Sequence, residues 1–204
     1  MGKNYSRNNA SGERKASDFY ETCYCLTREF VIAEIIKGEG WLFPFLEEDA
    51  WLEPACGNGA IVKVLAEFGY TNIVSFDFMK DGIDFLVYPR HHPYMITNPP
   101  YSLAHEFILH AKEIIDDQFA LLLPLTYLQG QRRYEEIFSD RDYPLKTVYV
   151  FTRYPMLGEP LREDGKIHTG MQAYAWFVWS KEYMGSPIIK WLDINKYVLR
   201  KGDV

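Results

Sequence analysis

The feature that most constrains the fold is a regular alternation between short apolar runs and segments with the apolar spacing of a helix. Residues 50–53 are predicted to form a short buried strand, residues 60–68 follow a helical pattern that stops at Gly69, and residues 72–77 are predicted to form a second strand. A strand, a helix and a strand in this order predict two parallel strands that are joined by a crossover helix.

The alternation continues along the chain and predicts an α/β fold with a doubly wound sheet. Residues 119–123 are apolar throughout, which is typical of a parallel strand covered on both faces. Further strands are expected at 94–97, 147–151 and 172–180, and further helices from an N-cap at Thr27, from an N-cap at Ser102 to about Ile115, and over 130–138. Sheets of this kind bind their ligands at the carboxyl ends of the strands.

Length and charge limit the domain organisation and the partners. A chain of 204 residues is close to the size of one domain, so we expect a single domain over residues 18–204 after a disordered basic arm at 1–17. The net charge is −6, and the arm, with four Lys and Arg and one Glu, contributes 4 − 1 = +3, which leaves −6 − 3 = −9 for the rest. Proteins that bind duplex phosphates usually have a basic face, so contacts with nucleic acid are expected to be weak and local, or to use the arm.

The cysteines and the hydropathy suggest an intracellular chain without a metal site. Cys23, Cys25 and Cys56 are an odd number, and no second pair or nearby His cluster completes a zinc site, so we expect reduced thiols and no metal. No stretch reaches the roughly 20 apolar residues of a membrane span, and the N-terminal residues are polar. We therefore expect a cytoplasmic location.

A glycine turn lies between the first predicted strand and its helix. It reads Glu53-Pro-Ala-Cys-Gly-Asn-Gly59, and its two glycines allow the backbone to approach a ligand closely. The third glycine of the dinucleotide fingerprint and the Lys-Ser/Thr of a phosphate loop are both missing. Asp77 follows about 20 residues later at the end of the next strand, where it is placed to accept hydrogen bonds from ribose hydroxyls. The alternative interpretation of Asp77 is an ordinary turn residue.

The most specific motif is Asn98-Pro99-Pro100-Tyr101, which directly follows the strand predicted at 94–97. The two prolines fix the backbone and hold Asn98 extended, so that its side-chain oxygen and the Pro99 carbonyl face one point. Two acceptors suit an –NH₂ group, because accepting both hydrogens frees its lone pair for attack. Tyr101 is placed to stack on the planar group that bears the nitrogen. A simple proline-rich turn is the alternative.

Several other polar residues are interpreted more simply. His91 and His92 are expected in a solvated turn, and Arg132 with Arg133 on a solvated helix face next to two glutamates. His105 and His110 lie on a predicted helix without the partners of a catalytic triad. Residues 153–170 hold prolines, glycines and charges, and form a candidate lid over the substrate.

Taken together, these motifs resemble the S-adenosylmethionine-dependent amino-methyltransferases, which act on adenine N6, cytosine N4 or glutamine amides. Asp18-Phe-Tyr-Glu-Thr22 is similar to their N-terminal cofactor motif, with Cys23 in place of its proline. Residues 121–134 and 173–179 resemble a small phage and bacterial group within this superfamily, so that the likeness spans residues 18 to about 192. Nothing resembles the separate target-recognition domain of restriction-modification enzymes.

The resemblance implies a fold and a set of site residues. The fold is a Rossmann-like class I methyltransferase sheet, mostly parallel, with an antiparallel C-terminal strand. The cofactor would be S-adenosylmethionine, with no metal, and the residues implied to bind it are Tyr20, Thr22, Glu53, Pro54, Ala55, Gly57, Gly59, Asp77, Phe78, Asp84 and Phe85. Asn98, Pro99, Pro100 and Tyr101 would hold the acceptor amine.

The expected reaction is methyl transfer to an exocyclic amine, with adenine N6 in DNA as the first choice. An RNA base and a protein glutamine amide are the alternative acceptors. A phage-type protein that binds the cofactor without turnover is a further alternative. A nicotinamide oxidoreductase is disfavoured by the missing third glycine and by the Asn-Pro-Pro-Tyr motif.

Overall fold

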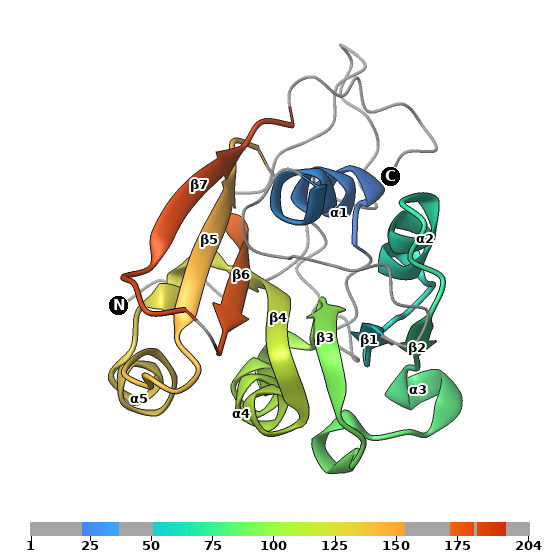
Figure 1. Cartoon of the computed structure of the whole chain (residues 1–204), viewed down its shortest axis with the longest axis horizontal. Coiled ribbons are helices and arrows are strands. Elements are labelled where there is room, and N and C mark those ends of the chain that lie inside the picture. The colour runs from blue at the N-terminus through green and yellow to red at the C-terminus, as the bar shows by residue number, and fades with distance from the viewer. Residues whose placement is uncertain (1–21, 37–50, 154–171, 182, 195–204) are drawn as a thin grey trace, which may run out of the picture.

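The computed structural model describes residues 22–36, 51–153, 172–181 and 183–194, which form one seven-stranded sheet with helices on both faces (Figure 1). The strand order is β2-β1-β3-β4-β6-β5-β7. The strands are β1 (Trp51–Glu53), β2 (Ile73–Ser75), β3 (His92–Thr97), β4 (Ile115–Pro124), β5 (Leu145–Phe151), β6 (Tyr174–Ser180) and β7 (Ile188–Leu192). Only β6 is antiparallel to its neighbours in this sheet, so the mostly parallel α/β fold with an antiparallel strand near the C-terminus is confirmed.

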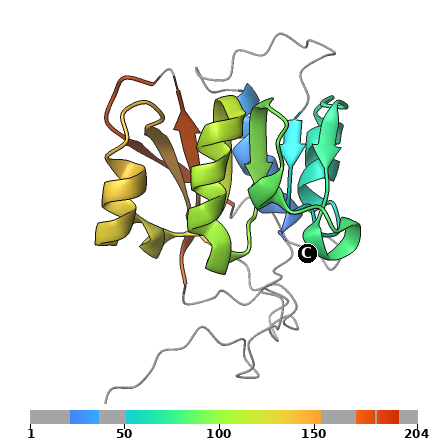
Figure 2. The same ribbon diagram turned by 90° about the horizontal axis from the view of Figure 1, so that it is seen from below.

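The helices divide between the two faces, as in a doubly wound sheet. Their bounds are α1 (Tyr24–Phe30), which continues as a π-helical segment over Val31–Ile36, α2 (Ala60–Glu67), α3 (Phe78–Asp81), α4 (Ala104–Ile114), and α5 (Gln131–Arg133), which continues as a π-helical segment over Tyr134–Phe138. The buried residues of α1 and α2 pack on one face, and those of α4 and of the segment after α5 pack on the other (Figure 2).

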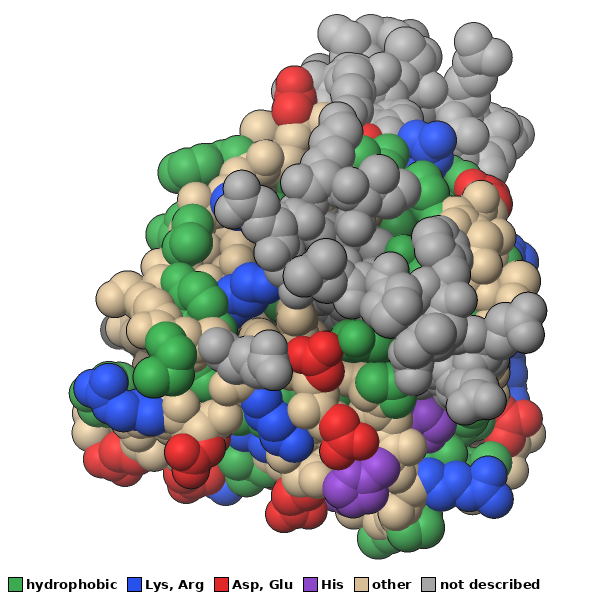
Figure 3. Space-filling view, in the orientation of Figure 1, with side chains coloured by type: hydrophobic (Ala, Val, Ile, Leu, Met, Phe, Trp, Pro, Cys, Tyr) green, Lys and Arg blue, Asp and Glu red, His purple; other side chains and the backbone are tan. Residues whose placement is uncertain are grey.

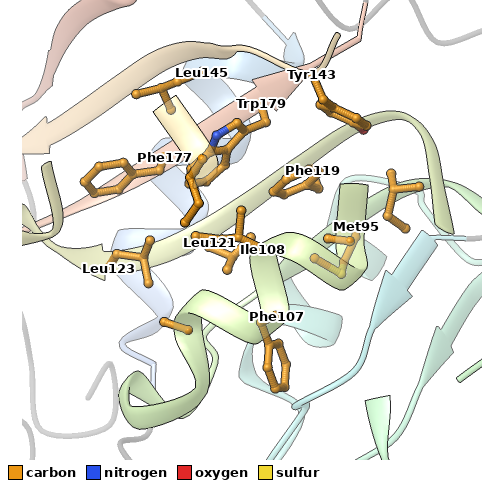
Figure 4. Close-up of a cluster of buried hydrophobic side chains, with 14 of the residues drawn as sticks. Met95, Phe107, Ile108, Phe119, Leu121, Leu123, Tyr143, Leu145, Phe177 and Trp179 are labelled. Carbon is orange, nitrogen blue, oxygen red and sulfur yellow. The ribbon is translucent and has the colours of Figure 1, made fainter. Parts of the chain in front are cut away.

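Strand β4 shows why the core has two halves. Its side chains alternate, so that Ala120 and Leu122 join the cluster under α1 and α2, while Phe119, Leu121 and Leu123 join the cluster under α4 (Figure 4). All five are fully buried. A strand covered on both faces needs the continuous apolar run that residues 119–123 supply.

Many of the aromatic residues belong to this core. Phe119 stacks on Trp179 with 5.0 Å between ring centroids, and Phe177 stacks on Trp179 at 6.0 Å. On the other face Phe30 stacks on Trp176 at 4.8 Å. Burying such a ring stabilises a fold by roughly 1.5–3 kcal/mol, so the stacked rings contribute to the core together with the buried aliphatic side chains.

Two helix starts differ from the sequence prediction. Helix α1 begins at Tyr24 with Cys23 as its N-cap, and Thr27 is a fully buried helix residue and not the cap. The buried Cys25 and Leu26 explain the earlier start, because packing holds the turn that local capping chemistry does not. Helix α4 begins at Ala104, because the segment Tyr101–Leu103 forms a 3-10 turn first, and Ser102 is therefore not its cap.

The structure also corrects the interpretation of His92 and the count of strands. His92 lies inside β3 and is buried, whereas the sequence suggested a solvated turn; pairing with Ile115 of β4 extends the strand to it. Its ring Nε2 lies 3.2 Å from the Tyr88 hydroxyl. Strand β7 was not predicted, because four of its five residues are exposed and it pairs with β5 alone in the described sheet.

Several expectations fall on residues that the structure does not describe. They concern the arm at 1–17, Tyr20 and the candidate lid from residue 154 to residue 170. Among the residues that are described, no helix is long and apolar enough to cross a membrane.

Candidate active site

The candidate site lies where three adjacent parallel strands end. β1, β2 and β3 are neighbours in the sheet, and their carboxyl ends lead into the glycine turn, into Asp77 and into Asn98, respectively (Figure 1). Residues 20 to 44 positions apart in the sequence therefore meet at one edge, as expected for parallel strands.

The glycine turn has the backbone conformation that the two glycines suggest. Gly57 and Gly59 have φ angles of 49° and 78°, in the left-handed region that glycine adopts without strain. The turn is tied to the end of β2, because Cys56 N donates to Phe76 O at 3.1 Å and Phe76 N donates to Glu53 O at 3.1 Å. The backbone of the turn is therefore held in place before any ligand binds.

Asp77 joins the glycine turn to α3. Its Oδ2 accepts from Gly57 N at 3.1 Å, and its Oδ1 accepts from Met79 N at 2.9 Å, which makes Asp77 the N-cap of α3. The structural interpretation of Asp77 as a turn residue is thus correct, and it does not conflict with a ligand role. Each carboxylate oxygen has two lone pairs and accepts one backbone N–H here, so further acceptor capacity remains for hydroxyl groups.

Lys80 is a residue of this site that sequence reasoning missed. From α3 its ammonium donates to Gly57 O and, at 3.1 Å, to Asn58 Oδ1. A Lys three residues after the strand-end Asp was the available signal, although spacing alone does not show that it reaches back over the turn. With Asp77 it holds the turn from the side of α3.

Glu53 is the most unusual polar residue of the site. It is fully buried at the end of β1, and its Oε1 accepts from Thr97 Oγ1 at 2.6 Å and from Ala55 N at 3.3 Å. Its Oε2 is buried and has no hydrogen-bond partner in the described part of the chain. Burial raises the pKa of Glu53 to about 8, the two donors oppose that rise, and the negative charge of Asp77 adds to it. Thr97, which had no sequence signal beyond its place before Asn98, is what orients this carboxyl.

Asn98 is held by the segment that precedes α1. Its Nδ2 donates to Thr22 Oγ1 at 3.0 Å, and Thr22 itself is buried. Because the amide nitrogen faces Thr22, the amide oxygen is turned away from it, as the acceptor of an amine must be. The structure thus brings the candidate residues Thr22 and Asn98 together across 76 positions of sequence.

Tyr101 faces a second aromatic ring. Its centroid lies 5.5 Å from that of Tyr174, with 35° between the ring planes. Tyr174 is the first residue of β6 and pairs with Pro124 at the carboxyl end of β4. The aromatic composition of residues 174–179 predicts a strand, but only the antiparallel pairing places its first residue beside Tyr101.

The candidate cofactor-binding residues Phe78, Asp84 and Phe85 lie in different environments. Asp84 is the N-cap of the 3-10 turn Phe85–Val87, and its Oδ1 accepts from Leu86 N at 3.0 Å. The Phe85 ring is buried against Phe107 of α4, 4.7 Å between centroids. Phe78 at the start of α3 is 59% exposed, so of the two phenylalanines it presents its ring to solvent.

His105, Arg132 and Arg133 form contacts near the surface of the described part of the chain. His105 Nε2 lies 2.6 Å from Glu136 Oε2, and Arg132 also pairs with Glu136, at 3.0 Å, which confirms Arg132 on a solvated helix face. The expectation for Arg133 is corrected, because its guanidinium donates to the carbonyls of Thr126, Tyr127 and Gln129 and is only half-exposed. All three bonds come from Arg133 Nη1, and the carbonyls belong to the 3-10 turn Leu125–Leu128 and to Gln129 directly after it.

The thiols are buried to different extents. Cys23 and Cys25 are fully buried, with 2.7 Å between their sulfurs, and Cys56 in the glycine turn is half-buried. Burial and the nearby carboxylates raise the pKa of Cys56. The described residues contain no cluster of three metal-ligating side chains.

Charges of both signs are interspersed on the face seen in Figure 3, with Lys and Arg beside Asp and Glu along its lower edge. This view shows no concentrated basic area.

The comparisons with known proteins agree in fold. No family model and no curated protein matches the chain. Among solved structures, a protein from Vibrio vulnificus YJ016 described as a modification subunit of a type I restriction enzyme has a TM-score of 0.50 at 15% identity, covering 91% of this chain and 49% of that one. The chain thus spans about half the length of that neighbour.

Two further structures are similar at lower scores. A protein from Pyrococcus horikoshii described as an RNA methyltransferase has a TM-score of 0.47 at 14% identity, covering 80% of this chain and 91% of its own. The magnesium protoporphyrin IX methyltransferase of Synechocystis PCC 6803, solved with bound S-adenosylhomocysteine, has a TM-score of 0.46 at 12% identity. The match covers 78% of this chain and 84% of that one. The strand order and the likeness to the Vibrio vulnificus structure show a Rossmann-like α/β fold.

Proposed function

We propose that this chain transfers a methyl group from S-adenosylmethionine to an exocyclic amino nitrogen, with adenine N6 in DNA as the acceptor. One observation carries the proposal. The glycine turn with Asp77 and the Asn98-to-Tyr101 segment, each weak alone, lie at the carboxyl ends of adjacent strands of a methyltransferase-type sheet. A donor and an acceptor must meet at such an edge for group transfer.

The residues present fit the cofactor. Asp77 retains acceptor capacity for ribose hydroxyls, and the exposed Phe78 ring with Asp84 suits the adenine. Glu53 has a buried oxygen without a partner among the described residues, which suits the positively charged methionine end of the cofactor. The resemblance implies that Thr22, which accepts from Asn98, also contacts the cofactor. When bound, S-adenosylmethionine supplies an electrophilic methyl group on a positively charged sulfur.

The chain's own residues prepare the amine. Asn98 Oδ1 and the Pro99 carbonyl accept its two hydrogens, which favours a tetrahedral nitrogen with a free lone pair. A nitrogen–carbon bond forms as the sulfur–carbon bond breaks, and the proton lost by the nitrogen passes to solvent. Positioning and electrostatics therefore supply most of the rate.

Tyr101 and Tyr174 fit a planar acceptor. A base inside a duplex cannot reach the cofactor and must be flipped out, and stacking on an aromatic ring offsets the lost base stacking by roughly 1–3 kcal/mol. The neighbour described as a modification subunit belongs to a system that acts on DNA, which agrees with this acceptor.

The test is incubation with labelled S-adenosylmethionine and separate pools of duplex DNA, single-stranded DNA, RNA and cell protein. We expect label in DNA, recovered as N6-methyladenine. Asn98→Ala should reduce turnover by a factor on the order of 10²–10³ while cofactor affinity changes little, because Asn98 acts on the amine.

Other outcomes would change the assignment. Label in RNA or in protein glutamine would identify that group, and not DNA adenine, as the methyl acceptor. Cofactor binding without any labelled product would indicate a binding protein without turnover. Full turnover by Asn98→Ala would remove the amino-methyltransferase proposal.

A further inference from the structure

Glu53 carries an inference that rests on the proposed function and goes beyond it. The carboxyl is completely shielded from solvent, and its two oxygens differ. Oε1 accepts from Thr97 Oγ1 and Ala55 N, whereas Oε2 has no partner within the described ranges. A negative charge in such a place is costly unless a cation compensates it.

Among the described residues, those that act on Glu53 are two uncharged donors and one carboxylate, and none of them is a cation. Asp77 after β2 is close enough to act on Glu53 by its charge, and Cys56 in the glycine turn is acted on by the charges of Glu53, Asp77 and Asp81. β3 contributes the uncharged hydroxyl of Thr97. Lys80 on α3 is the nearby basic group, and its ammonium bonds Gly57 O and Asn58 Oδ1 instead.

We propose that Glu53 is a proton-exchanging receptor for a cationic ligand: it is a neutral acid in the unliganded protein and binds the positively charged end of S-adenosylmethionine as a carboxylate, releasing its proton to solvent. The exchange keeps the buried site close to electrically neutral in both states. The raised pKa of Glu53 agrees with a neutral acid at pH 7, and an adjacent positive charge lowers a carboxyl pKa.

The inference predicts a measurable proton release. Calorimetric titration with S-adenosylmethionine at pH 7, in two buffers of different ionisation enthalpy, should show close to one proton released for each ligand bound. Between pH 6 and pH 7 the affinity should rise about tenfold, because one proton is released in that range. The ligand's own amino group stays mostly protonated there.

Two controls separate Glu53 from other groups. Adenosine shares the ribose and the base but has no positive charge, so its binding should release no proton. Glu53→Gln has the shape of the neutral acid, and it should bind S-adenosylmethionine more weakly, with no proton release and an affinity that is the same at pH 6 and pH 7.

The outcomes distinguish this inference from the proposed function. Absence of S-adenosylmethionine binding at any pH would overturn both. Binding by the wild-type protein without proton release, or equal release with adenosine, would overturn the Glu53 inference alone. These measurements use the wild-type protein and decide the matter even if Glu53→Gln does not fold; equal proton release by a folded Glu53→Gln would also overturn it.

Discussion

Asp77 has two structural contacts besides the ligand role proposed for it. It accepts from Gly57 N in the glycine turn and from Met79 N in α3, so removing its carboxylate affects both elements. Asp77→Ala should weaken S-adenosylmethionine binding by roughly 1–3 kcal/mol, the range for a charge-assisted hydrogen bond. Loss of the N-cap should also lower the free energy of unfolding by about 1 kcal/mol.

Asp77→Asn is the matched control, because its amide oxygen can still accept from Met79 N. We expect it to keep most of the stability and to lose affinity in calorimetry. Unchanged affinity in a folded Asp77→Ala protein would exclude Asp77 from the ligand site, and tight binding of NADH would favour an oxidoreductase.

Glu53 also makes stability depend on pH. Its folded pKa of about 8 lies above its ordinary value near 4.5, so the folded protein retains the proton over a range where the unfolded chain has lost it. Below about pH 4.5 the Glu53 carboxyl therefore does not lower the free energy of unfolding. As the pH rises from there to about 8 the carboxyl lowers it progressively, and above about pH 8 the loss of stability is complete. Glu53→Gln should match the wild type near pH 5 and exceed it near pH 9, by on the order of a few kcal/mol.

Urea unfolding of the unliganded proteins at several pH values measures this difference. The Thr97 hydroxyl lowers the pKa of Glu53, so Thr97→Val should raise that pKa further. In this variant the free energy of unfolding should therefore keep falling to a higher pH than in the wild type. A constant difference between Glu53→Gln and the wild type from pH 5 to pH 9 would show that the folded carboxyl titrates normally.

At the scale of the elements, the glycine turn requires glycine at position 59 because of the backbone conformation there, and not because a larger side chain would clash. A Cβ added at Gly59 would meet nothing within 4 Å, but the φ angle of 78° is unfavourable for other residues. Gly59→Ala should therefore lower the free energy of unfolding by about 1–2 kcal/mol and weaken cofactor binding. Gly59→Asn should cost less, because asparagine tolerates this conformation.

Gly82 provides a matched comparison at the end of α3. Its φ angle is 68° and an added Cβ would also meet nothing within 4 Å. Gly82→Ala should lower stability by a similar amount, as measured by thermal or urea unfolding, with a smaller effect on cofactor affinity. If Ala and Asn at position 59 were equally harmful, contact with the ligand and not backbone strain would set the preference for glycine.

At the scale of the whole molecule, charge limits how the chain meets nucleic acid. The net charge is −6, and −9 without the first 17 residues. Duplex DNA should therefore bind weakly, and the affinity should fall steeply with salt. Deleting residues 1–17 should lower the affinity and reduce the salt slope by up to about 0.9 for each basic residue that contacts a phosphate.

Fluorescence anisotropy with a labelled duplex between 50 and 200 mM salt, on the order of physiological ionic strength, measures both quantities. Replacing the four Lys and Arg of the arm with Gln keeps its length and should have the same effect as deletion. Nanomolar, salt-insensitive binding by the shortened protein would contradict this account and would locate the contacts in the folded part.

Local chemistry alone is enough to predict the strand–helix alternation, the glycine turn and the position of Asn98-Pro-Pro-Tyr101 after a strand. Each of these depends on local chemistry: apolar spacing, left-handed glycines and prolines that fix the backbone. The sequence also places Asp77 at the end of the strand after the glycine turn, and the structure adds the hydrogen bond between Asp77 and Gly57 N.

Only the tertiary structure decided which side chains face one another. Three contacts of the site depend on packing between distant elements. They join Thr22 to Asn98, Tyr174 to Tyr101 and Lys80 to the glycine turn. Phe85 enters the core because α4 covers it, although its sequence context resembles a ligand contact. The state of Glu53 depends on burial from every side and on two hydrogen bonds to one of its oxygens, and such an environment exists only once β1, β2 and β3 have assembled.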